Sequence, residues 1–274
     1  MKPPTGQETP TRDRIPRVLW VGLVAAIAYV LIAAGGGLLV DAALGADPDP
    51  VIELAASHLI PLPIAIGAGL LFAWRSGWWQ DIWTDPPIHH TKPRRWWMLL
   101  VPLAIAAQIV VLLIATPWAQ LSAAYIFVGL LCYLLVGLGE ELFFRGILLE
   151  SVRAHHGETV TLLVTAIAFG VAHAFGSSLA GVPLGTIAFQ VGVTAMEGVL
   201  FYAALRAAGT LWVPIVLHGL GDWGRWLTAE NDDSTATPAG VTQIIMTVLS
   251  VAVLISVILE DRRARKARAA THPA

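Results

Sequence analysis

The sequence predicts an all-α membrane protein, a polytopic bundle of about eight transmembrane helices. Of its 274 residues, 56% are hydrophobic and only 13% are charged, and the mean hydropathy is +0.70. A single soluble domain of this length would need a more polar surface than this composition supplies. Apolar runs also recur at about the 20 residues that a helix needs to cross a bilayer.

Eight such runs can be marked in order along residues 18–260, which form one predicted transmembrane domain. The first run is longer than the apolar part of a signal peptide and is followed by no convincing cleavage site, so a retained helix is expected. Residues 1–17 and 261–274 are polar and are predicted to be short cytoplasmic tails. The predicted spans are Val18–Val40, Leu54–Trp74, Trp96–Pro117, Leu121–Leu149, Val160–Phe175, Pro183–Leu205, Leu211–Leu227 and Val241–Leu259.

The positions of Lys and Arg predict which side each loop faces, because basic short loops stay in the cytoplasm. An N-inside start places every Lys and Arg except Arg225 in the cytoplasm, including those of the basic loop Lys92–Arg95. The opposite loops carry Asp and Glu, from Asp41 to Glu53 and from Glu230 to Asp233. We therefore expect a multi-pass cell-membrane protein with both termini cytoplasmic. Its Ala-, Gly- and Arg-rich composition with short loops is typical of a bacterial protein.

Ionisable residues within the spans are few, and three groups of them have helical spacing. Glu140 and Glu141 precede Arg145, Phe169 precedes His173 by four residues, and His218 precedes Asp222 by four. Residues four apart share a helix face. A charge at the bilayer centre costs roughly 2.5 to 3.5 kcal/mol on insertion scales, so such residues indicate a functional site.

Helical rise places Glu140, His173 and His218 at similar depths, roughly 10 to 20 Å from the expected cytoplasmic ends of their helices. Three helices would then contribute polar groups to one place. We expect a common cavity that opens toward the cytoplasm.

These three motifs, in this order, resemble those of the CAAX protease and bacteriocin-processing (CPBP, or Abi) family of intramembrane proteases. The resemblance covers residues 121–227 and includes the run Leu211–Ile215 before His218. It implies an all-helical bundle that cleaves peptide bonds in or beside the membrane. Eukaryotic members act on prenylated C-a-a-X proteins, whereas bacterial relatives are associated with peptide maturation or self-immunity.

By this resemblance Glu140 would be the general base, His173 would help to hold the attacking water, and His218 would face the substrate carbonyl oxygen. Glu141 would pair with Arg145, and Phe169 would support His173. Many relatives carry Asn where this chain has Asp222, and an ionised carboxylate cannot donate to an oxyanion. Asp222 would therefore either stay protonated, or orient and charge His218 so that the imidazole becomes the main donor.

A metal site is an alternative, since Glu140, His173 and His218 would suffice as ligands of a catalytic zinc ion. The chain has no H-E-x-x-H run, the usual helix signature of zinc proteases, and the resemblance favours catalysis by glutamate without a tightly bound metal. The G-x-G-D string at Gly219–Asp222 matches intramembrane aspartyl proteases, but no second Asp lies within a span. Its glycines are expected to let helices approach closely.

The sequence leaves the roles of several residues, and two alternative functions, undecided. Glu197 lies in the sixth span without an obvious partner, His58 is predicted to be a tolerated interfacial residue, and Gly35–Gly37 indicates close packing or a flexible helix end. A proton-coupled transporter would also use carboxylates and histidines near the bilayer midplane, although no convincing internal repeat is found. A third reading is a non-catalytic immunity or scaffold protein of the same family. The predicted partners are the lipid bilayer and a peptide or membrane-anchored protein substrate, with no nucleic acid.

Overall fold

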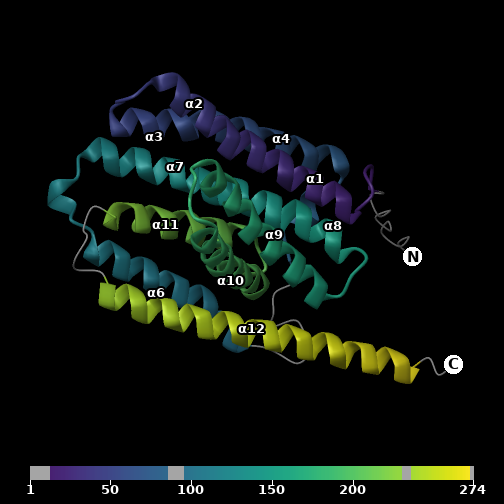
Figure 1. Ribbon diagram of the computed structural model, residues 1–274. Coiled ribbons are helices and arrows are strands. Elements are labelled where there is room, and N and C mark those ends of the chain that lie inside the picture. The colour runs from purple at the N-terminus through teal and green to yellow at the C-terminus, as the bar shows by residue number, and fades with distance from the viewer. Residues whose placement is uncertain (1–12, 86–95, 230–235, 272–274) are drawn as a thin grey trace, which may run out of the picture.

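The computed structural model describes residues 13–85, 96–229 and 236–271 as a bundle of helices (Figure 1). In these ranges no strand is formed beyond an isolated bridge between Thr84 and Thr210. The α-helices are α1 (Leu19–Val30), α2 (Gly36–Leu44), α3 (Pro50–Leu59), α4 (Pro61–Ser76), α5 (Trp79–Trp83), α6 (Leu100–Ala115), α7 (Ala123–Glu141), α8 (Leu149–Arg153), α9 (Glu158–Leu179), α10 (Leu184–Ala208), α11 (Trp212–Thr228) and α12 (Ala236–Thr271). The predicted all-α polytopic class is confirmed.

Among the described residues, seven helical segments are long and apolar enough to cross a membrane. They are Leu19–Leu44, Pro50–Ser76, Trp96–Ala115, Ala123–Arg153, Glu158–Leu179, Leu184–Ala208 and Thr242–Ala267. The remaining predicted span, Leu211–Leu227, forms α11, which has 17 residues. This helix packs against α6, α7 and α10, so the bundle surrounds the helix that carries His218 and Asp222.

Two of the long segments are irregular. The first runs from α1 through a π-helical turn, η1 (Leu31–Gly35), into α2 without leaving the helical conformation. The second is split into α3 and α4 at Pro61, since a proline lacks the N–H that would continue the hydrogen-bond ladder. The side chain of Asp49 caps α3 by accepting from the backbone N–H groups of Val51 and Ile52.

Helices α7 and α11 approach each other through a pair of glycines. A Cβ on Gly137 would lie 2.6 Å from the carbonyl oxygen of Ile215, and a Cβ on Gly219 would lie 2.7 Å from that of Tyr133. Any larger residue would force the two backbones apart. The predicted close-packing role of the G-x-G-D string is confirmed at Gly219, one residue after His218.

Ion pairs tie the segments together at the end of the bundle where α1 begins. Arg17 contacts Glu150 at 3.1 Å, and Arg206 contacts Asp85 at 2.7 Å. Helix α1 begins and α12 ends at this end in Figure 1, whereas α2 and α3 meet at the opposite end. The structure thus gathers the basic groups around α1, α8 and α10 at one end, as the distribution of charges predicts.

The two predicted tails are partly built into the bundle. The indole of Trp78 donates to the carbonyl oxygen of Ile15 at 3.0 Å, so the segment before α1 is packed down. Helix α12 continues to Thr271, and Asp261 is buried, where it accepts from the backbone N–H of Thr159 at 2.8 Å. Asp261 therefore belongs to the bundle, where it caps the start of α9, whereas residues 262–267 are exposed. The expected loop residues Lys92–Arg95 and Glu230–Asp233 lie outside the described residues.

Candidate active site

The paired glutamates lie at the last turn of α7 and point in different directions, because adjacent helix residues differ by about 100°. The Glu140 side chain is 16% exposed and lines a cavity, whereas that of Glu141 is completely buried. A π-helical turn, η5 (Leu142–Leu148), follows at once and is buried throughout. Such turns often occur at functional sites, where they re-aim side chains.

Glu141 holds two other side chains. Its Oε1 accepts from Nη1 of Arg145 at 2.9 Å and lies 2.9 Å from Nδ1 of His218. The Arg145 guanidinium also lies over the Phe169 ring, 3.9 Å from its centroid. Because both members of the Glu141–Arg145 pair are fully buried, each charge depends on the other for compensation.

His173 on α9 faces Glu140 with one defined ring nitrogen. Nδ1 lies 2.9 Å from the carbonyl oxygen of Phe169, which can only accept, so Nδ1 carries the proton. Nε2 lies 3.8 Å from Glu140 Oε2, beyond a direct hydrogen bond. In the neutral imidazole this Nε2 is a hydrogen-bond acceptor, and the Glu140 Oε2 atom that it faces is also an acceptor when the carboxyl is ionised.

His218 on α11 is surrounded by carboxylates and is nearly buried. Its Nε2 lies 3.3 Å from Asp222 Oδ2 and 3.6 Å from Glu140 Oε2, while its Nδ1 faces Glu141. The Phe201 ring stacks on the imidazole, with centroids 4.5 Å apart. The structure therefore brings together all four predicted catalytic residues, Glu140, His173, His218 and Asp222.

Arg225 supplies the partners that the sequence did not reveal. Its Nη2 donates to Asp222 Oδ1 at 2.6 Å, and its Nη1 lies 3.4 Å from Glu197 Oε1. The expectation that Glu197 lacks a partner is wrong, because a neighbouring helix provides one. Arg225, the exception in the predicted charge distribution, lies in α11 and compensates two carboxylates there.

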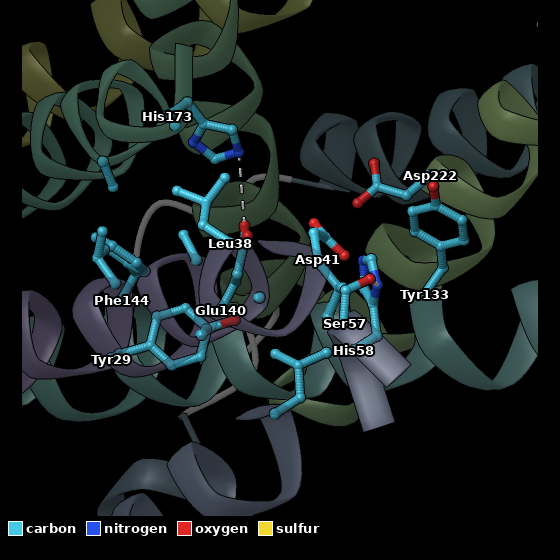
Figure 2. Close-up of a pocket in the computed structure, with 18 residues that line it drawn as sticks. Tyr29, Leu38, Asp41, Ser57, His58, Tyr133, Glu140, Phe144, His173 and Asp222 are labelled. Atoms are coloured by element: carbon cyan, nitrogen blue, oxygen red, sulfur yellow. Dashed lines mark hydrogen bonds and ion pairs between the residues drawn. The ribbon is translucent and has the colours of Figure 1, made fainter. Parts of the chain in front are cut away.

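A cavity of about 500 Å³ adjoins the four residues, and Figure 2 shows its lining. Glu140, His173 and Asp222 line it, together with residues from α2, α3 and α7 that the sequence did not assign to a site: Asp41, Ser57, His58 and Tyr133. Tyr29 and Phe144 line it as well. His58 is thus part of the cavity wall, contrary to its predicted role as an interfacial residue. The four-residue spacing of Gly37 and Asp41 could have indicated this part of the site, because it places the Asp41 carboxylate on the same helix face as a closely packed glycine.

The lining residues extend toward one end of the bundle. Asp41 lies near the end of the segment Leu19–Leu44, Ser57 and His58 lie near the start of the second span, and Gly176 lies near the end of α9. The cavity thus extends toward the end of the bundle that lies opposite Arg17. In the sequence, the loops of that end carry Asp and Glu. A cavity that extends this way cannot open to the cytoplasm in an N-inside chain, so the two expectations conflict. Counting helical rise from the cytoplasmic ends predicted that Glu140, His173 and His218 lie at similar depth. It gave no information on the direction in which their cavity opens.

A zinc centre formed by Glu140, His173 and His218 is the alternative that the sequence offers. Within the described ranges no group of three or more His, Cys, Asp or Glu side chains is placed to hold a metal ion. Both nitrogens of His218 face carboxylate oxygens, those of Glu141 and Asp222, which can accept hydrogen bonds from the ring.

Residues 122–224 match the family model described as type II CAAX prenyl endopeptidase Rce1-like. This matched segment, 103 of the 274 residues, is similar to the CAAX protease family. No curated protein and no solved structure matches the chain. The match supports a CAAX-type membrane protease at the level of the family, and it agrees with the resemblance found in the sequence.

The Rce1-like segment, residues 122–224, contains every motif residue described above, from Glu140 to Asp222. It ends one residue before Arg225, and it excludes α1 to α6. The cavity wall formed by Tyr29, Asp41, Ser57 and His58 therefore lies outside the segment that matches the family.

Proposed function

We propose that this protein is an intramembrane endopeptidase in which Glu140 and His173 activate a water molecule that attacks a peptide bond. The observation that carries the proposal is the position of Glu140 Oε2, which is buried without a hydrogen-bond partner between His173 and His218. An ionised Glu140 Oε2 and a neutral His173 Nε2 are both acceptors, and because they lie 3.8 Å apart both can accept from one water molecule.

The hydrolysis then follows from the groups in place. Glu140 takes a proton from the water as its oxygen bonds to the carbonyl carbon, which forms a tetrahedral oxyanion. Glu140 next delivers that proton to the amide nitrogen, the C–N bond breaks, and an acid and an amine leave. His173 orients the water throughout, because its tautomer is fixed by the Phe169 carbonyl.

His218 is the proposed oxyanion donor, and its surroundings support the alternative in which Asp222 charges and orients the ring. Carboxylate oxygens face both nitrogens, which favours an imidazolium with a proton on each nitrogen. Asp222 is itself held by Arg225, which supports an ionised carboxylate. Donors fixed in advance around a developing charge stabilise the transition state strongly.

Glu141 and Arg145 act in this proposal as positioning residues. Glu141 Oε1 binds His218 and Arg145 together, so it sets the ring orientation from a site that does not touch the cavity. The Phe169 ring lies beneath the guanidinium, and its carbonyl oxygen orients His173. Phe169 thereby links His173 to the Glu141–Arg145 pair that positions His218.

Cleavage by the purified full-length protein tests the proposal. A library of fluorescent peptides is incubated with the wild type, with Glu140→Gln and with His173→Ala, while His156→Ala, an exposed loop variant, serves as the matched control. Loss of a general base should lower kcat about 100-fold or more, and the control should match the wild type. Equal cleavage by Glu140→Gln would refute the assignment.

Two further arms separate the alternatives. Activity that a chelator abolishes and zinc restores would move Glu140 to a metal ligand. Proton-coupled uptake into proteoliposomes without any peptide cleavage would instead support a transporter. Neither result is expected from the hydrogen-bonding pattern around Glu140.

The side of the membrane from which substrate enters is part of the proposal. Basic groups at the α1 end favour an N-inside orientation, and the cavity extends toward the opposite, acidic end. We place the opening of the cavity on the outer side of the membrane. A peptide or a membrane-anchored segment would reach Glu140 from there.

A further inference from the structure

We propose that Asp41, Ser57, His58 and Tyr133 form a subsite that binds a basic side chain of the substrate peptide. The inference rests on the proposed function, since the subsite shares its cavity with Glu140 and His173 (Figure 2). We call these four residues the acceptor subsite. It joins α2 and α3, outside the matched family segment, to Tyr133 on α7.

Asp41 presents a carboxylate that the protein itself does not use. Its Oδ1 is buried and has no hydrogen-bond partner among the described residues. Leaving a buried acceptor unpaired is costly, so such an atom at a cavity wall indicates a ligand that donates to it. His58 lines the same cavity.

Close packing of α2 against α3 holds Asp41 in this position. A Cβ on Gly37 would lie 3.2 Å from the carbonyl oxygen of Ser57, so the two helices approach at a glycine. Asp41 is four residues further along α2 and therefore on the same face. The contact directs the carboxylate toward Ser57 and His58.

His58 contributes a second acceptor, as its neighbours show. Nδ1 lies 3.0 Å from the carbonyl oxygen of Leu54 and 3.1 Å from Ser57 Oγ. The Ser57 hydroxyl already donates to the carbonyl oxygen of Glu53 at 2.7 Å, so Nδ1 must be the donor to both. Nε2 of the neutral ring then carries a lone pair, and the subsite offers acceptors to its ligand.

Tyr133 adds an aromatic face to the subsite. Its ring lies beside His58, with the centroids 6.0 Å apart, and both residues line the cavity. A cation over the face of Tyr is attracted by the ring quadrupole. Carboxylate, imidazole lone pair and aromatic ring together suit an ammonium or guanidinium group.

The charge of the whole cavity favours the same ligand. Asp41, Glu140 and Asp222 line it, and no Lys or Arg is among its lining residues. The nearby Arg225 is already paired with Asp222 and Glu197. An acidic peptide would meet repulsion in this cavity, whereas a Lys or Arg side chain would be attracted.

Binding and cleavage by the full-length protein test the subsite separately. Peptides that carry Lys, Met or Glu at one position, scanned along the chain, are bound to the Glu140→Gln variant and cleaved by the wild type. At one position we expect Lys to be preferred over Met by about tenfold in both measurements, a factor typical of a partly buried charged hydrogen bond. Asp41→Asn should remove this preference by raising KM for the Lys peptide.

Asp47→Asn, an exposed carboxylate in the turn after α2, is the matched control and should keep the preference. Asp41→Lys should reverse it, so that Glu peptides are bound best. Equal binding of Lys and Met peptides, or a preference that survives Asp41→Asn, would overturn the subsite. Asp41-dependent binding without wild-type cleavage would leave the subsite standing and refute the protease instead.

Discussion

Replacement of Glu141 by Met is expected to destabilise the protein strongly, because two cationic groups depend on this carboxylate. The side chains of Glu141 and Arg145 are both 0% exposed, and Glu141 Oε1 lies 2.9 Å from Arg145 Nη1 and 2.9 Å from His218 Nδ1. Removing one partner of a buried ion pair costs about 3 to 5 kcal/mol. The Phe169 ring beneath the guanidinium contributes about 2 kcal/mol with or without Glu141, so it does not replace the carboxylate.

The free energy of unfolding is measured in mixed micelles with increasing SDS, and the eleven tryptophans provide the fluorescence signal. Glu53→Gln, an exposed carboxylate on α3, is the control and should change stability by less than about 0.5 kcal/mol. The double variant Glu141→Met/Arg145→Met should regain at least half of the loss, because an apolar pair replaces an uncompensated charge.

Activity should not return with stability in the double variant, since His218 Nδ1 still lacks its carboxylate. This separates the positioning of His218 from a purely structural role. A single variant within about 1 kcal/mol of the wild type, or a double variant no more stable than the single one, would refute the reasoning.

Three other predictions follow from the packing and the charges. In a Cys132→Ala background, Ser57→Cys should react with a membrane-impermeant maleimide that is added outside intact cells. Arg14→Cys should react only after the cells are permeabilised. The reverse pattern would contradict an outward opening of the cavity. Gly219→Ala should lower the free energy of unfolding by about 1 to 3 kcal/mol, because its Cβ would lie 2.7 Å from a backbone oxygen, whereas Gly67→Ala, with open space around it, should not destabilise. Arg225→Met should lower kcat/KM about tenfold in steady-state cleavage assays, because it leaves Asp222 without its cationic partner. Glu197→Gln should lower kcat/KM less than threefold. A larger effect of Glu197→Gln would assign the main role to Glu197.

Much of the bundle and its polar motifs was predictable because the bilayer allows few solutions. Apolar runs of about 20 residues must be helices, since the backbone finds no other partners in lipid. The cost of intramembrane charge made Glu140, Glu141, His173 and His218 conspicuous, and four-residue spacing predicted the Glu141–Arg145 pair. That pair is present at 2.9 Å.

Contacts between helices were not predictable, because they depend on packing that no local pattern encodes. The partner of Glu197 is Arg225, 28 positions further along the chain and on another helix. The link between Glu141 and His218 joins residues 77 positions apart. Both require the close approach of neighbouring helices, which the glycines permit but do not specify.

The sequence by itself determined that this chain is a helical membrane protein and which ionisable residues lie within it, since hydropathy and charge cost are properties of single segments. Tertiary structure alone decided that Asp41 and His58 share the cavity of Glu140, and that the cavity extends toward the acidic end. The reason is geometric, because a cavity is bounded by side chains from several helices, and its direction follows from how those helices cross.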